Sequence, residues 1–185
     1  METDVDRRQR FEMAVAEVYD PLQRYLGRRA HADDVSELLN DVLLVLWRRL
    51  DDVPMADLLP WTYGVAKRCV ANNRRGNDRR HRLVGRLIAD PFTPRHHDQP
   101  SLSDDAHNEL TTALTRLDES ERELVRLWAW ERLEPREIAI VLDTTANAVS
   151  LRLTRAKKKI ASSMRRQNDA DAGHEAFGYR KGARS

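Results

Sequence analysis

Residues 135–154 read PREIAIVLDTTANAVSLRLT, and this stretch decides the fold that we predict. Apolar residues recur in it at spacings that place them on the facing sides of two helices: Ile138, Leu142, Val149 and Leu153. Residues 143–145 form a short polar turn between the helices. Pro135 suits a first helical turn, where its missing N–H has no intrahelical partner. The stretch therefore predicts a helix-turn-helix motif.

The second of these helices is the candidate reader of DNA, because a helix of this motif enters the major groove. The turn position that glycine often holds is Asp143, and aspartate tolerates left-handed backbone better than most residues. The predicted contact residues are Arg136, Asn147, Ser150, Leu151, Arg152, Thr154, Arg155 and Lys158. An ordinary αα-hairpin with a basic solvated face is the alternative interpretation.

Two cationic segments stand out in a chain whose net charge is only +2. Residues 67–86 hold eight Lys/Arg and one acid, and residues 144–166 hold seven Lys/Arg and no acid. Each segment therefore carries +7, and the remaining residues together carry −12. A polyanion relieves the repulsion within such segments by counterion release, which favours nucleic acid as a partner.

The rest of the chain is also patterned for helices. Helical periodicity runs through residues 7–29, with Gly27 as a plausible stop, through 34–50, and from 60 to 73 with a basic continuation to 88. Residues 90–105 contain three prolines and read as a linker. We predict an all-α chain of two small helical domains, 1–89 and 106–166, joined by a flexible linker, with a disordered tail at 167–185.

Composition excludes several classes of protein. The 185 residues include no apolar run of about 18, and the charged N-terminus resembles no secretory signal. One cysteine, Cys69, excludes a disulfide framework, and we expect it to be a small buried residue. His96 and His97 lack partners at metal-ligand spacing. We expect no enzyme, no catalytic residue, no metal and no cofactor.

The ordered pair of helical blocks resembles the extracytoplasmic-function sigma factors, the small two-domain members of the sigma-70 family. Residues 114–160, which contain the helix-turn-helix, look like their region 4. In the first block, residues 37–43 (ELLNDVL) resemble the D-L-V-Q-E-V-F signature of region 2, and residues 59–66 (LPWTYGVA) resemble the start of the helix that reads the −10 element. The resemblance covers about residues 10–166.

This resemblance implies a subunit that binds core RNA polymerase and reads the −35 and −10 promoter elements. It implies that polymerase is contacted at the clamp coiled coil and the flap, with clamp contacts from Glu37, Leu38, Asn40, Asp41 and Leu44. It assigns the −10 element to Lys67, Arg68, Asn72, Asn73, Arg74, Arg75, Asn77, Arg79 and Arg80. It also implies an anti-sigma partner and a cytoplasmic location, with tethering at the membrane where that partner is anchored there.

Two other functions remain open at the level of sequence. A stand-alone helix-turn-helix regulator would use residues 1–90 for dimerisation or sensing, and a helical adaptor would bind proteins only. Neither accounts for the cationic segment at 67–86, because dimerisation and protein binding have no need of it. Among the tryptophans, we expect Trp61 and Trp128 to be core residues, since aromatics at helical spacing usually are.

Overall fold

The computed structural model describes residues 4–87, 114 and 117–178, and their side chains apart from 80–87, 164 and 166–178. Within these residues all regular structure is helical, which confirms the all-α prediction. The linker predicted at 90–105 lies outside the described residues. The chain forms two compact units, and the first joins the N-terminal helices with Arg136–Thr145. The second contains Ser101–Pro135 and Ala146–Ser185.

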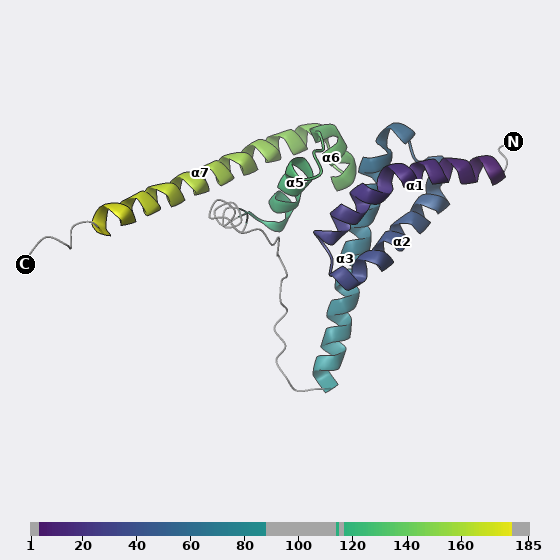
Figure 1. The fold of residues 1–185 in the computed structure, drawn as a ribbon, viewed down its shortest axis with the longest axis horizontal. Helices are drawn as coiled ribbons and strands as arrows, with labels where there is room; N and C mark the ends of the chain where they lie inside the picture. The colour runs from purple at the N-terminus through teal and green to yellow at the C-terminus, as the bar shows by residue number, and fades with distance from the viewer. Residues whose placement is uncertain (1–3, 88–113, 115–116, 179–185) are drawn as a thin grey trace, which may run out of the picture. The chain divides into compact units, whose positions relative to one another are not determined.

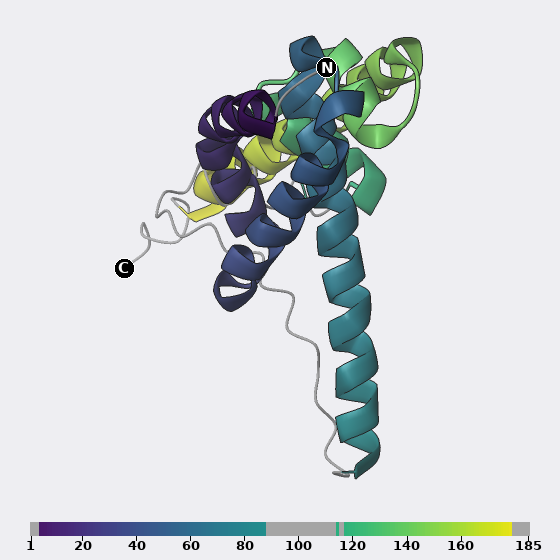
Figure 2. The ribbon, with the colours of Figure 1, turned by 90° about the vertical axis from the view of Figure 1, so that its right-hand side faces the viewer.

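Three α-helices build the N-terminal part of the first unit, α1 (Asp4–Gly27), α2 (Ala32–Arg49) and α3 (Leu58–Leu87) (Figure 1). Two short 3-10 turns, η1 (Leu50–Asp52) and η2 (Met55–Asp57), connect α2 to α3. The sequence analysis placed a helix at 60–73 with a basic continuation to 88, and in the structure both parts form one continuous helix, α3, which extends past α1 and α2 (Figure 2). Residues 74–87 contain no proline and are rich in arginine, a good helix former, so the helix tolerates Gly76.

The core of the first unit is the stripe of apolar residues that each helix turns toward the other two. α1 contributes Val18, Leu22 and Leu26, α2 contributes Leu38, Val42 and Leu46, and α3 contributes Tyr63, Ala66 and Val70, all of them buried. The Tyr25 and Tyr63 rings stack with centroids 4.8 Å apart. Trp61 is half-buried rather than a full core residue.

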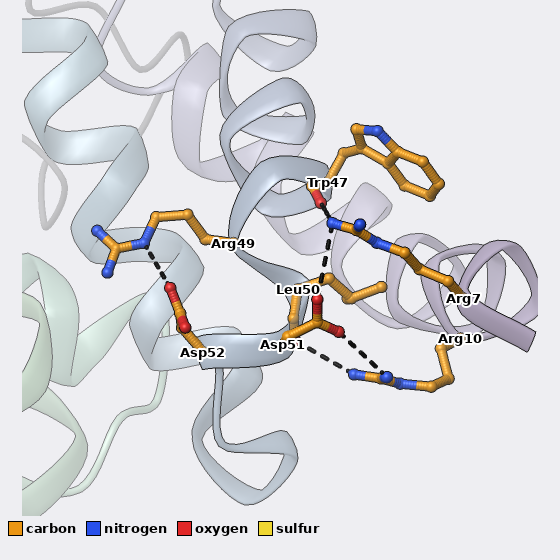
Figure 3. A network of polar contacts seen from close by, with 7 residues as sticks. All are labelled: Arg7, Arg10, Trp47, Arg49, Leu50, Asp51 and Asp52. Atoms are coloured by element: carbon orange, nitrogen blue, oxygen red, sulfur yellow. Dashed lines mark hydrogen bonds and ion pairs between the residues drawn. The ribbon is translucent and has the colours of Figure 1, made fainter. Parts of the chain in front are cut away.

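Two arginines of α1 bind the carboxyl end of α2 (Figure 3). Arg7 donates to the Trp47 carbonyl at 3.0 Å and lies 3.8 Å from the Asp51 carboxylate. Arg10 donates to the Asp51 carboxylate at 3.3 Å and to the Leu50 carbonyl at 3.4 Å. The last four carbonyls of a helix have no partner within it, and cations are stabilising at that end. These contacts therefore fix where α2 ends.

Cys69 is half-buried on α3, where a fully buried residue was expected. Burial raises the pKa of its thiol, and the negative charge of Asp41 on α2 raises it further. The positive charge of Arg68 opposes both effects and is the smallest of the three. The thiolate, which is the nucleophilic form, is therefore disfavoured in the folded chain.

The second unit contains α5 (Glu119–Ala129) and α7 (Ala146–Gly178), which pack on each other (Figure 1). Asp118 caps α5: its carboxylate accepts from the Glu121 amide at 2.8 Å, and the Glu121 side chain accepts from the Asp118 amide at 3.3 Å. α7 continues to Gly178, through part of the tail that we expected to be disordered. Residues 167–178 contain no proline and include three alanines, so the helix continues through Gly173 and ends at Gly178.

Helix α6 (Pro135–Leu142) begins at the proline that the sequence placed in a first turn. It ends in a Schellman motif, since the Thr144 amide donates to the Ala139 carbonyl at 3.0 Å and the Asp143 amide to the Ile140 carbonyl at 3.4 Å. Asp143 has a φ of 52°, so it adopts the left-handed conformation that this motif requires. The expectation of a short turn with Asp143 in place of glycine is confirmed.

Replacing Arg7 by methionine should lower the free energy of unfolding of the first unit by about 1–2 kcal/mol, because a carbonyl at the end of α2 loses its charged donor. Hydrogen exchange of the last amides of α2 in urea measures this loss. Arg8→Met is the matched control, since Arg8 makes an exposed pair with Glu12 on the same helix and should cost about 0.5 kcal/mol or less. Equal losses in the two variants would contradict a specific role for Arg7.

Cys69 should react with iodoacetamide at a higher pH in the folded chain than in urea, because its raised pKa delays formation of the thiolate. Asp41→Asn removes one cause of the shift, so the midpoint of the rate–pH profile should move to lower pH. Asp33→Asn, an exposed substitution on the same helix, should leave the profile unchanged. Identical profiles for the folded chain, the unfolded chain and Asp41→Asn would refute the assigned causes.

Candidate nucleic-acid interfaces

One face of α3 carries an exposed row of four residues that we call the arginine row: Arg68, Asn72, Arg75 and Arg79. They follow one another at four- and three-residue spacing, which keeps them on one side of the helix. The Arg75 guanidinium donates to the Asn72 side-chain oxygen at 2.6 Å, and the Arg68 guanidinium donates to the Gly64 carbonyl at 3.2 Å. At 1.5 Å per residue the row spans about 16 Å of helix.

Three other residues predicted for the −10 element, Asn73, Arg74 and Asn77, form hydrogen bonds within the first unit. Arg74 donates to the Arg29 carbonyl at 2.9 Å. The Asn77 amide donates to the Asn73 side chain at 3.1 Å and to the Asp34 carboxylate at 3.4 Å. Arg29 and Asp34 lie more than forty residues away in sequence from the residues that they bind, so no local pattern could reveal these two contacts.

Two residues of the same predicted set remain. Lys67 is half-exposed at the border of the core. The side chain of Arg80 lies outside the described residues.

A second exposed row lies on α2, and we call it the acidic row: Glu37, Asn40, Asp41 and Leu44. It combines two carboxylates and an amide with a leucine that is 46% exposed. Leu38 was predicted to contact polymerase, but it is only 2% exposed and packs in the core. Leu38 lies on the face of α2 that packs in the core. It therefore stabilises the helix that carries the acidic row and does not itself contact polymerase. Arg48, one turn beyond Leu44, is also exposed and was missed by the sequence analysis.

Helix α7 divides into a buried face and an outward face. Val149, Leu153 and Ala156 are buried. The outward face, which we call the reading face, holds exposed residues from the predicted −35 set: Asn147, Ser150, Leu151, Thr154, Arg155 and Lys158. The helical period brings these residues together on one side of α7.

The flanks of α7 are tied to α5. Arg152 donates to the Ser120 hydroxyl and Lys159 binds the Glu121 carboxylate. On the other flank, the Lys157 ammonium lies 3.4 Å from the centre of the Trp128 ring. Arg152 is therefore half-exposed at the border of the reading face and engaged with α5.

Trp128 was expected to be a core residue, but it is 41% exposed, and the Lys157 ammonium lies over its ring. The buried face of α5 is made by Leu124, Val125 and Leu127. Trp128 follows Leu127 directly and lies at the surface. A cation resting on an aromatic face is stabilised without full burial of the ring. This contact explains the position of Trp128.

Arg136 lies on α6 and is exposed. Within the first unit, its guanidinium donates to both oxygens of the Asp57 carboxylate, at 3.0 and 3.3 Å. No local sequence pattern indicates this pair, because the two residues are 79 positions apart. Arg136 lies on α6 and is not part of the reading face of α7, and its contact with the −35 element stays a prediction.

Two negative findings apply to the described part of the chain. No helix there is long and apolar enough to cross a membrane. No group of three or more His, Cys, Asp or Glu residues is arranged there to hold a metal ion. His96 and His97 lie outside these residues.

Comparison with known proteins identifies the C-terminal block. Residues 107–160 match the model of the family described as Sigma-70, region 4. Over 134 residues the chain is 30% identical to the RNA polymerase sigma factor NccH of Alcaligenes xylosoxydans xylosoxydans, and the alignment covers 70% of this chain and 72% of that protein.

The fold is similar to that of a solved sigma factor. The sigma factor RpoE of Bartonella quintana, solved in complex with the anti-sigma factor NepR, matches 84% of this chain and 96% of its own, with a TM-score of 0.54 and 19% identity. The sequence relationship to NccH extends well beyond the helix-turn-helix block. The chain thus belongs to the sigma-70 family of RNA polymerase sigma factors, in the extracytoplasmic-function group.

Proposed function

We propose that this sigma factor divides its work among three exposed rows, each on one helix. The acidic row of α2 binds core RNA polymerase, the arginine row of α3 binds the −10 element, and the reading face of α7 binds the −35 element. One observation supports the proposal: each row lies on the exposed face of one helix, and the three rows differ in charge and in the kinds of side chain that they present. The domain limits of 1–89 and 106–166 belong to the same proposal.

The acidic row suits a basic helical partner such as the clamp coiled coil of the largest polymerase subunit. Leu44 offers an exposed apolar anchor, and the carboxylates of Glu37 and Asp41 lie on the same face. Helical recognition commonly uses such anchors at three- and four-residue spacing. The charges orient the partner and speed its association, while the leucine contributes buried area.

The arginine row suits a strand of DNA that is being opened. Its guanidiniums can neutralise phosphates, and the Asn72 amide can bond the edge of an unstacked base. Unstacking costs a few kcal/mol per base, which contacts to the extruded base and its backbone can repay. Because Asn72 accepts from Arg75, the amide is already held in place before DNA arrives.

On α7, the reading face suits the major groove of the −35 element. Arg155 and Asn147 carry donors long enough for base edges, and Lys158 can hold a phosphate. Arg152, Lys157 and Lys159 stabilise the packing of α7 on α5 instead. The binding energy of this unit therefore depends on fewer cations than its sequence contains.

We further propose that the chain supplies binding and orientation and no chemistry of its own, and that it acts in the cytoplasm. An anti-sigma factor belongs among the proposed partners, because the similarly folded sigma factor of Bartonella quintana was solved with one. Such a partner would compete with polymerase or with DNA for the rows described above. Where the anti-sigma factor is anchored in a membrane, the sigma factor would be held there.

Leu44→Ala should weaken binding to core polymerase by about five- to thirtyfold, because it removes the apolar anchor of the acidic row. Fluorescence anisotropy of the labelled full chain, titrated with core polymerase, measures the affinity. Met13→Ala is the matched control, since Met13 is also an exposed apolar residue and lies on α1. Unchanged affinity of Leu44→Ala would remove the acidic row from the polymerase interface.

Arg75→Ala should weaken promoter binding by the holoenzyme on all promoter sequences alike. The slope of log affinity against log salt should become shallower by about 0.7–0.9, the value for one phosphate contact. Arg8→Met removes an exposed cation on α1 and should leave the slope unchanged. A loss that differs between promoter sequences at constant slope would instead assign Arg75 to a base.

A further inference from the structure

Leu151 is an apolar residue in the middle of a polar surface. It is 53% exposed on the reading face, where Asn147, Arg155 and Lys158 surround it. The buried residues of α7, such as Val149 and Leu153, lie on the opposite side of the helix. Packing within the unit therefore does not account for Leu151.

The two hydroxyl residues of the reading face are turned toward the helix backbone. The Ser150 hydroxyl donates to the Ala146 carbonyl at 2.9 Å, and the Thr154 hydroxyl donates to the Ser150 carbonyl at 2.9 Å. A threonine in this arrangement has its hydroxyl proton engaged by the backbone and offers its γ-methyl group for other contacts. Because Thr154 follows Leu151 by three residues, this methyl group and the leucine are neighbours on the helix surface.

The major groove offers one apolar feature to such a pair. Adenine, guanine and cytosine present donors and acceptors there, whereas thymine adds a C5-methyl group. Leu151 is the sixth residue of α7, and the N-terminal part of a recognition helix is the part that reaches base edges. We propose that Leu151 determines specificity by contacting the C5-methyl group of a thymine in the −35 element.

This inference rests on the proposed function of the reading face and adds the chemical group that it recognises. A leucine cannot form a hydrogen bond to a base, so its selectivity comes from excluding water around the methyl group. Burying one methyl group is worth roughly a fourfold change in affinity. Leu151 therefore tunes the choice at one base pair, while the longer polar residues supply most of the binding.

The experiment uses the full chain bound to core polymerase and a promoter fragment from which this holoenzyme initiates. Each thymine of the −35 element, on either strand, is replaced in turn by deoxyuridine, which lacks only the methyl group. Competition against the unmodified fragment gives the affinity ratio of thymine to uracil at each position. Leu151→Ala and Leu151→Gln are compared with the unsubstituted chain, and Val5→Ala, an exposed apolar truncation on α1, is the control.

We expect the unsubstituted chain and Val5→Ala to prefer thymine over uracil about fourfold at one position. Both Leu151 variants should bind the unmodified fragment correspondingly less well and lose that preference. Leu151→Gln replaces the apolar end of the side chain by an amide without shortening the side chain. If both variants lose the preference for thymine over uracil, the apolar contact is responsible and not the size of the side chain.

Three results would overturn the inference. One is a −35 element without thymine, another is equal affinity for thymine and uracil at every position, and the third is an unchanged preference in the Leu151 variants. In all three cases −35-dependent binding persists, so the proposed function of the reading face stands. If binding does not depend on the −35 element at all, the proposed function and this inference fail together.

Discussion

Each helix of this chain buries one apolar stripe, and that constraint organises everything else in the two units. Val18, Leu22 and Leu26 of α1 meet the buried stripes of α2 and α3, and α5 and α7 do the same in the second unit. A helix that buries about a third of its circumference leaves the opposite side free for charged residues. The three proposed binding rows are these opposite sides, so their positions follow from the packing of the core.

The periodic parts of the sequence were sufficient to predict α1, α2, α6 and the start of α7, whereas the candidate residues on α2 and α3 came from the resemblance to the sigma factors. Helix α1 ends at Gly27, α6 begins at Pro135, and the left-handed residue between α6 and α7 is Asp143, all as local chemistry predicts. Local rules were insufficient where a residue can take either of two environments. Leu38 lies beside exposed residues in sequence but packs in the core. Trp128 is apolar yet remains at the surface, where its ring contacts the Lys157 ammonium.

Charge density in the sequence overstated how many cations are available to a ligand. Arg74, Arg152 and Lys159 belong to the two basic segments, but their partners are a distant carbonyl, a serine and a glutamate of neighbouring helices. Such pairings depend on tertiary structure and have no signature in a single segment. These cations therefore already have partners within the chain, and binding a phosphate would compete with those partners.

The turn after α6 carries a consequence for how relatives of this chain are recognised. The Schellman geometry requires a positive φ at Asp143. It does not require a residue without a side chain at that position. Glycine, asparagine and aspartate all meet that condition, and codons for each of the other two differ from an aspartate codon by a single base. A motif search that demands glycine at the turn would discard such chains, whereas one written in terms of backbone conformation would retain them.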